Sequence, residues 1–200
     1  MSQGRNLVNI LVCGVGGQGV LLFSDLLANL ALNAGLDVKK SEVHGMAQRG
    51  GSVTSHVRYG PKVYSPLIEE GTADLLVAFE SLEALRWVHF LSDSGRVVYD
   101  PYRIEPMPVR LGLTEPVPDS HISQRLAERA ADVRQVPAFE IAHRLGNTRV
   151  QNVVMLGAVS HYLEFPAEAF QNIIRTLVKP GLVQINLEAF AAGRAAIDPL

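Results

Sequence analysis

The chain has 200 residues, with 18 Lys and Arg against 20 Asp and Glu, 48% hydrophobic residues and a single cysteine. One cysteine excludes an internal disulfide framework, and it excludes a four-thiolate zinc or iron–sulfur site built from this chain alone. The near-neutral charge argues against a nucleic-acid binder that neutralises many phosphates. No apolar run approaches the roughly 18 residues of a membrane span, and the N-terminus lacks the apolar core of a signal peptide. We therefore expect a cytoplasmic protein in which residues 1–200 form one domain.

The first forty residues predict a strand, a glycine-rich turn, a helix and a second strand. Leu7–Val12 is nearly all apolar, as in a strand buried on both faces, and it runs into the glycines of residues 14–19. Apolar residues at helical spacing predict a helix from Val20 to Ala34, with Gly35 just past its end. Asp37–Val43 follows as the second strand. This order is typical of a doubly wound sheet.

The next segment predicts a β-hairpin extension of that sheet. A glycine-rich loop at residues 44–51 precedes Ser52–Arg58, whose alternating pattern predicts a half-buried strand. Tyr59–Lys62 predicts a turn and Val63–Tyr64 a short return strand.

The rest of the chain alternates between strands and helices before it becomes helical. The further predicted strands are Ala73–Phe79, Val97–Tyr99 and Val133–Val136. The predicted helices are Ser81–Phe90 with Ser81 as N-cap, one capped by Asp119 or Ser120 and running through Ala131, Ala138–Leu145, Val150–Leu163, one that begins at Pro166, and Leu187–Ala196. Five of the eleven prolines fall within residues 101–118, which predicts a loop or an extended cover. The expected fold is an open, doubly wound, mostly parallel, Rossmann-like α/β sheet with a β-hairpin extension and a helical C-terminal part.

The glycine turn is the first candidate binding site. Gly14, Gly16 and Gly19, with Gly17 and Gln18 between them, match the fingerprint that lets a pyrophosphate approach backbone N–H groups at a helix N-terminus. Glu42 stands where a ribose-binding acid is expected, so an NAD(P)-dependent dehydrogenase is one interpretation. A second interpretation is that the glycines only permit tight packing of strand on helix.

The loop after the second strand is the other candidate site. Consecutive glycines beside an arginine can form an anion-binding nest, in which backbone N–H groups and a guanidinium converge on a phosphate or carboxylate. The alternative is a structural turn in which Arg49 pairs with a neighbouring carboxylate. The candidate residues are His44, Gly45, Gln48, Arg49, Gly50 and Gly51, with His56 and Arg58 behind them. No His or Cys pair stands at ligand spacing, so no metal site is predicted.

These two blocks together resemble a known family. The matching residues are 14–19, 42–51, Val53 and 57–60, with weaker matches at Asn152, Gly157, Asn186, Ala189, Phe190 and Gly193. The pattern is similar to the gamma subunit or domain of the 2-oxoacid:ferredoxin oxidoreductases, and within that family to the indolepyruvate branch. The resemblance extends over nearly the whole chain.

The resemblance implies a reaction in which a 2-oxoacid, coenzyme A and oxidised ferredoxin give an acyl-CoA, carbon dioxide and reduced ferredoxin. It also implies that a large alpha subunit carries the thiamine diphosphate, Mg²⁺ and iron–sulfur clusters. This chain would then complete or cover the active site and be inactive alone. The loop of residues 45–51 would lie at the interface. The composition of this loop adds the hypothesis that Arg49 is the candidate catalytic residue and faces a substrate carboxylate or a coenzyme A phosphate. Further alternatives are a non-catalytic nucleotide- or coenzyme A-binding module, and a homodimer of the isolated chain.

Overall fold

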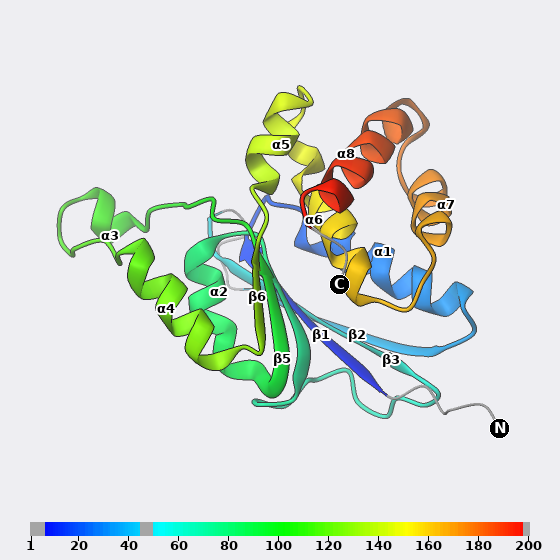
Figure 1. The fold of residues 1–200 in the computed structure, drawn as a ribbon, viewed down its shortest axis with the longest axis horizontal. Coiled ribbons are helices and arrows are strands. Elements are labelled where there is room, and N and C mark those ends of the chain that lie inside the picture. The colour runs from blue at the N-terminus through cyan, green and yellow to red at the C-terminus, as the bar shows by residue number, and fades with distance from the viewer. Residues whose placement is uncertain (1–6, 45–49, 198–200) are drawn as a thin grey trace.

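The computed structural model describes residues 7–44 and 50–197, apart from the side chain of His44, and within them six strands form one sheet (Figure 1). The strands are β1 (Val8–Val15), β2 (Asp37–His44), β3 (Ser52–Gly60), β4 (Ala73–Ala78), β5 (Leu91–Tyr99) and β6 (Asp132–Gln135). The α-helices are α1 (Val20–Asn33), α2 (Ser81–Trp87), α3 (Met107–Arg110), α4 (Asp119–Arg129), α5 (Ala138–Arg144), α6 (Gln151–Val159), α7 (Ala167–Leu177) and α8 (Val183–Ala195). The short 3₁₀ helices are η1 (Val88–Phe90), η2 (Thr148–Val150), η3 (Ser160–Tyr162) and η4 (Pro180–Leu182). None of these helices is long and apolar enough to cross a membrane.

The sheet confirms the predicted mostly parallel fold, with one difference in its strand order. The order is β2-β3-β1-β4-β5-β6, and β1, β4, β5 and β6 run parallel to one another. β3 is antiparallel to both β1 and β2, so it separates the two strands that the sequence pattern suggested as one parallel unit. The hairpin is therefore formed by β2 and β3 inside the main sheet.

The predicted return strand at Val63–Tyr64 is wrong. Both edges of β3 are already paired, which leaves no free edge for another strand. The segment after β3 is held by other contacts, since the backbone N–H of Val63 donates to Asp37 Oδ2 at 3.0 Å. The Arg58 guanidinium donates to the carbonyl oxygens of Ser65 and Leu67 at 2.9 and 2.8 Å.

Helices cover both faces of the sheet (Figure 1). α2 and α4 lie on one side, and α1, α6, α7 and α8 on the other. The alternation along β1 serves both layers, because Ile10 and Val12 belong to the core under the second group while Leu11 and Cys13 belong to the core under the first. This two-sided burial explains why the first strand reads as a continuous apolar run.

Several predicted helix ends are shifted or divided. The N-cap of α2 is Glu80, whose carboxylate accepts the Glu83 N–H at 2.9 Å, in place of Ser81. α4 begins at Asp119 after Pro118, and Pro166 is the residue before α7, so neither Asp119, Ser120 nor a first-turn proline has the expected role. The predicted helix from Val150 to Leu163 is divided into η2, α6 and η3.

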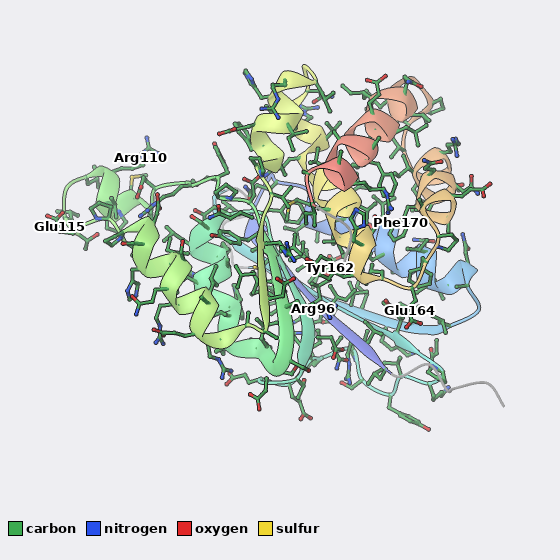
Figure 2. The ribbon with its side chains drawn as sticks, in the orientation of Figure 1. Arg96, Arg110, Glu115, Tyr162, Glu164 and Phe170 are labelled. Atoms are coloured by element: carbon green, nitrogen blue, oxygen red, sulfur yellow. The ribbon has the colours of Figure 1, made fainter. Side chains whose placement is uncertain are left out.

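The proline-rich segment forms the expected loop, with one short helix in it. α3 has no buried residue, and Arg110 and Glu115 lie on the arm that it forms at one end of the molecule (Figure 2). Arg103, which precedes α3, forms ion pairs with Glu105 at 2.8 Å and with Asp119 at the beginning of α4 at 2.9 Å.

α6 and α8 cross with almost no space between their backbones. A Cβ atom on Gly193 would lie 1.9 Å from the Val154 carbonyl oxygen, and one on Gly157 would lie 2.1 Å from the Phe190 carbonyl oxygen. Such distances are far below van der Waals contact, so any side chain at either position forces the helices apart. Since α6 is buried over its whole length, that movement disturbs the core.

Replacing Gly193 by alanine is therefore expected to lower the free energy of unfolding by about 3 kcal/mol or more. Urea unfolding of the isolated chain measures the effect. Gly181→Ala is the matched control, because a Cβ atom there meets no atom within 4 Å, and we expect a change below about 0.5 kcal/mol. A Gly193→Ala chain with an unchanged urea midpoint would contradict the tight crossing.

Candidate functional site

The glycine turn joins the end of β1 to the beginning of α1, as its spacing predicts. Gly17 and Gly19 have φ values of +109° and +85°, in the region that favours glycine. The Gly16 N–H donates to the Gly51 carbonyl at 2.9 Å, and the Gly50 N–H donates to the Gly16 carbonyl at 3.4 Å. The end of the second candidate segment therefore lies directly against the first.

Gln18 holds the turn in its shape. Its Oε1 accepts the Val15 N–H at 2.7 Å, and its Nε2 donates to the Phe79 carbonyl at 2.8 Å. The Gln151 amide donates to the same carbonyl at 3.1 Å and to Asp100 Oδ2 at 2.9 Å. The two glutamines thus tie the glycine turn to the ends of β4 and β5 and to the first residue of α6.

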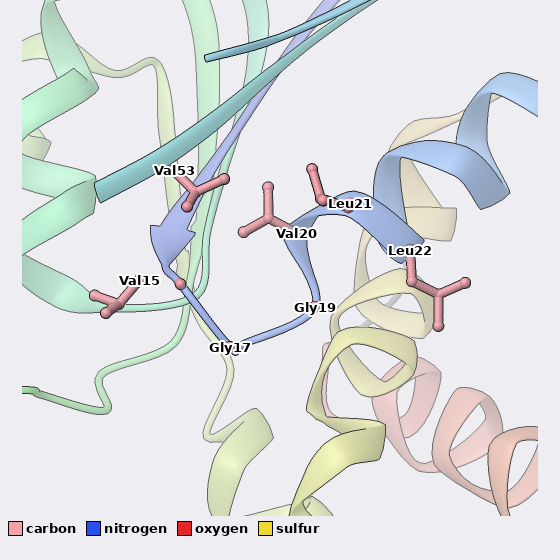
Figure 3. A pocket seen from close by; sticks show the side chains of 8 residues that line it. Val15, Gly17, Gly19, Val20, Leu21, Leu22 and Val53 are labelled. Atoms are coloured by element: carbon pink, nitrogen blue, oxygen red, sulfur yellow. The ribbon is translucent and has the colours of Figure 1, made fainter. Parts of the chain in front are cut away.

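A cavity of about 540 Å³ opens beside this turn (Figure 3). It is lined by Val15, Gly16, Gly17, Gly19, Val20, Leu21, Leu22 and Val53. Figure 3 shows Val53 of β3 facing Val20 at the first turn of α1. No described side chain caps that helix, so its first N–H groups remain available at the positive end of the helix dipole. The site offers an apolar wall next to donors that suit an anion.

Two buried carboxylates lie at the same edge of the sheet, where β4 and β5 end. Asp100 accepts the N–H groups of Tyr102 and Phe139 at 2.9 and 2.7 Å. Glu80 accepts the N–H of Ile104 at 3.1 Å in addition to that of Glu83. Burial raises the pKa of both carboxyl groups above their ordinary values. Apart from the Gln151 amide on Asp100, these partners are backbone N–H groups, so the two acids hold the segments that follow β4 and β5.

Sequence reasoning missed this set of Glu80, Asp100 and Gln151. The available signal is positional, because Asp100 directly follows β5 and Glu80 comes two residues after β4. Ligand-facing groups of open α/β sheets gather at the carboxyl ends of strands. The signal for Gln151 is weaker, because a glutamine at the beginning of a helix is common at exposed positions and does not by itself indicate a buried contact.

The structure places only part of the second candidate loop. Gly45, Gln48, Arg49 and the side chain of His44 lie outside the described residues. Gly50 and Gly51 are described and contact the glycine turn.

The side chains of His56 and Arg58 lie away from the glycine turn. In the β1–β3 register His56 lies opposite Leu11 and Arg58 opposite Asn9, further back along β1 than Val15. The buried His56 accepts the Ile68 N–H on Nδ1 at 3.1 Å, and Arg58 donates to Asn9 Oδ1 at 2.8 Å. Both side chains support the segment that follows β3.

Glu42 is also remote from the position of a ribose-binding acid. It lies on β2 and pairs with Lys40 at 2.6 Å. Because β3 separates β2 from β1, Glu42 is two strand spacings, about 10 Å, from β1. This placement removes the main support for the dehydrogenase interpretation.

Comparison with known proteins identifies the family. Residues 9–196 match the family model described as pyruvate ferredoxin/flavodoxin oxidoreductase. The chain is 39% identical over 189 residues to indolepyruvate oxidoreductase subunit IorB of Pyrococcus horikoshii, covering 92% of this chain and 93% of the relative. It is 41% identical to the subunit of the same name from Archaeoglobus fulgidus, covering 93% of each. A 2-oxoglutarate synthase subunit KorC from Methanothermobacter thermautotrophicus is 30% identical, covering 94% of each.

Solved structures share the fold. The gamma subunit of a keto/oxoacid ferredoxin oxidoreductase from Geobacter sulfurreducens has a TM-score of 0.69 at 21% identity, covering 94% of this chain and 97% of that one. The 2-oxoglutarate:ferredoxin oxidoreductase of Magnetococcus marinus, solved with 2-oxoglutarate, coenzyme A and succinyl-CoA bound, has a TM-score of 0.75 at 23% identity. The match covers 97% of this chain but 32% of that longer one. The chain belongs to the pyruvate ferredoxin/flavodoxin oxidoreductase family, which confirms the resemblance seen in its motifs.

The buried His56 gives a prediction about pH. Burial, and then the charge of Arg58, lower its pKa below the ordinary 6.5, so the unfolded chain binds the proton more readily than the folded one. The free energy of unfolding therefore falls as the pH drops below about 6.5. His56→Gln keeps an acceptor for the Ile68 N–H and removes the titration, so we expect its stability to fall less between about pH 8 and about pH 5.5.

Urea unfolding at several pH values compares the two chains. The same replacement at the exposed His143 is the control, and its curve is expected to run parallel to that of the wild type. Identical pH dependence of His56→Gln and the wild type would show that His56 stays solvated.

Proposed function

We propose that this chain is the small subunit of an indolepyruvate:ferredoxin oxidoreductase and works with a larger alpha subunit. The observation that carries the proposal is the identity of 39–41% to four subunits named indolepyruvate oxidoreductase subunit IorB, over 92–94% of this chain. Relatives named for 2-oxoglutarate or ketoisovalerate are only 28–30% identical. In the proposed reaction the 2-oxoacid loses carbon dioxide, its acyl carbon is oxidised and bonds to the coenzyme A sulfur, and the electron pair passes to ferredoxin.

The redox cofactors fit the partner better than this chain. An iron–sulfur cluster needs several thiolates, whereas the single Cys13 is fully buried in β1 and burial raises the pKa of its thiol well above the ordinary value. Within the described part of the chain, no three His, Cys, Asp or Glu side chains converge to hold a metal ion. We therefore assign thiamine diphosphate, Mg²⁺ and the clusters to the alpha subunit.

The part proposed for this chain is to bind coenzyme A and cover the active site. The uncapped N–H groups at the beginning of α1 suit a phosphate, and the aliphatic wall of the cavity suits the apolar part of the same ligand. Gly16, Gly17 and Gly19 line the cavity and keep the backbone open to the ligand, and Gln18 fixes their geometry. Gly14 instead lets Phe79 and Val20 pack closely behind the turn. The electrons pass to ferredoxin through the assembled complex and not through this chain alone.

The proposal is tested on the chain purified with a tag from its native cells. We expect it to bring a large subunit whose iron content and visible absorbance show iron–sulfur clusters, and to reduce a viologen dye with indolepyruvate only when coenzyme A is added. The same chain expressed alone is the control and is expected to be inactive. Activity with 2-oxoglutarate but not indolepyruvate would contradict the substrate, and a lone chain that binds NAD(H) tightly would contradict the class.

Arg49 gives a second test of the same proposal. A guanidinium contributes charge-assisted hydrogen bonds to a carboxylate or phosphate. Arg49→Ala in the assembled complex is therefore expected to raise the KM for coenzyme A or for the 2-oxoacid by about tenfold or more. Arg175→Ala, an exposed position on α7, is the control and should leave both KM values unchanged. Unaltered steady-state kinetics of Arg49→Ala would mean that Arg49 contacts neither substrate.

A further inference from the structure

The side chain of Asn152, the second residue of α6, lies against the beginning of α1. Asn152 is only 2% exposed. A Cβ atom on Gly19 would lie 2.7 Å from Asn152 Nδ2, 3.1 Å from its Cγ and 3.3 Å from its Cβ, so the amide nitrogen is the atom nearest to the turn. The missing side chain of Gly19 is what leaves room for this amide.

The hydrogen bonding of this amide is incomplete. Its Oδ1 accepts the Val153 N–H at 2.9 Å, which fixes the amide plane and leaves Nδ2 directed at Gly19. Among the residues that the structure describes, Nδ2 has no hydrogen-bond acceptor. Other buried amides nearby find acceptors, since Gln151 donates to Phe79 and Asp100, and Asn186 donates to the Leu182 carbonyl at 2.7 Å. Although Asn152 as a whole is 2% exposed, Nδ2 is not among the fully enclosed unpaired atoms of the described residues, so a further partner can still reach this donor.

A ligand oxygen at the beginning of α1 would supply an acceptor for Nδ2. α1 begins at Val20 with no capping side chain, and the Asn152 amide lies against Gly19 at that helix start. Each of these features favours a negatively charged oxygen. The aliphatic cavity that Gly19 also lines suits a ligand that carries an apolar arm next to its anionic group.

We infer that Asn152 is a further binding residue, whose Nδ2 donates a hydrogen bond to a phosphate oxygen of the ligand held at the beginning of α1. The inference rests on the proposed function, because coenzyme A is the ligand that supplies the phosphate. Asn152 then acts on binding of the co-substrate and takes no part in decarboxylation or electron transfer.

Asn152→Asp in the assembled complex tests this inference. The carboxylate has the shape of the amide and still accepts the Val153 N–H, but a charge at this buried position is expected to lower the unfolding temperature of the isolated subunit, which thermal unfolding records. The carboxylate provides no hydrogen-bond donor, and its negative charge repels a phosphate. The affinity for desulfo-coenzyme A, measured by isothermal titration calorimetry, is expected to fall by about tenfold or more. The KM for coenzyme A should rise in parallel, while kcat at saturating coenzyme A and the KM for the 2-oxoacid stay within about twofold of the wild type.

Two further variants make the result decisive. Asn29→Asp adds the same charge about 15 Å further along α1 and should bind desulfo-coenzyme A as the wild type does. Asn152→Ala removes the donor without adding a charge and should show a smaller loss of affinity; it decides the matter if the aspartate variant does not assemble.

The outcomes separate this inference from the proposed function. If both Asn152 variants bind desulfo-coenzyme A as tightly as the wild type, the inference is wrong and the proposed function stands. A rise in the KM for the 2-oxoacid alone would overturn it as well, because the amide would then serve a carboxylate. If the wild-type complex itself does not bind desulfo-coenzyme A, the proposed coenzyme A role fails first and the assignment of Asn152 falls with it.

Discussion

The geometry of the site depends on one carbonyl group, that of Phe79 at the end of β4. It accepts hydrogen bonds from Gln18 at 2.8 Å and from Gln151 at 3.1 Å, so one oxygen links the glycine turn to the beginning of α6. Gln151 also reaches Asp100 after β5. Since buried polar groups must be paired, each of these residues requires the others in place. The ends of three parallel strands and the beginnings of two helices are thereby held at one edge of the sheet.

The position of β3 separates this fold from a dinucleotide-binding enzyme with the same turn. In a plain strand–helix–strand unit the second strand lies beside the first and brings an acid to the ribose. Here β3 is paired along both edges, which moves β2 and Glu42 to the outside of the sheet. Ser52, at the beginning of β3, is paired with Val15 instead, so the glycine turn faces the chain that follows residue 50. Gly50 and Gly51, just before β3, thus contact the glycine turn.

Local patterns predicted the elements well and their arrangement less well. The apolar run from Leu7 and the glycine spacing at 14–19 predicted β1, the turn and α1, because each depends on burial or backbone conformation of the residues themselves. Strand order depends on pairings far apart in the chain, so no local pattern indicated that β3 lies between β1 and β2. The same reason explains Gln151 and Asn152, whose roles follow from contacts with Phe79 and Gly19 over more than seventy residues of sequence.

The electrostatic surroundings explain why neutral donors matter at this site. Glu80 and Asp100 lie buried beside the turn, and after burial itself Glu83 and Glu80 are the main causes that raise the pKa of Cys13. A bound phosphate would therefore meet negative charge from the protein interior. Backbone N–H groups at the beginning of α1 and an amide can offset part of that repulsion without a buried cation, whose desolvation is costly. The remaining positive charge has to come from outside this buried layer. Arg49 is the cationic residue nearest in the sequence to Gly51, whose carbonyl accepts the Gly16 N–H.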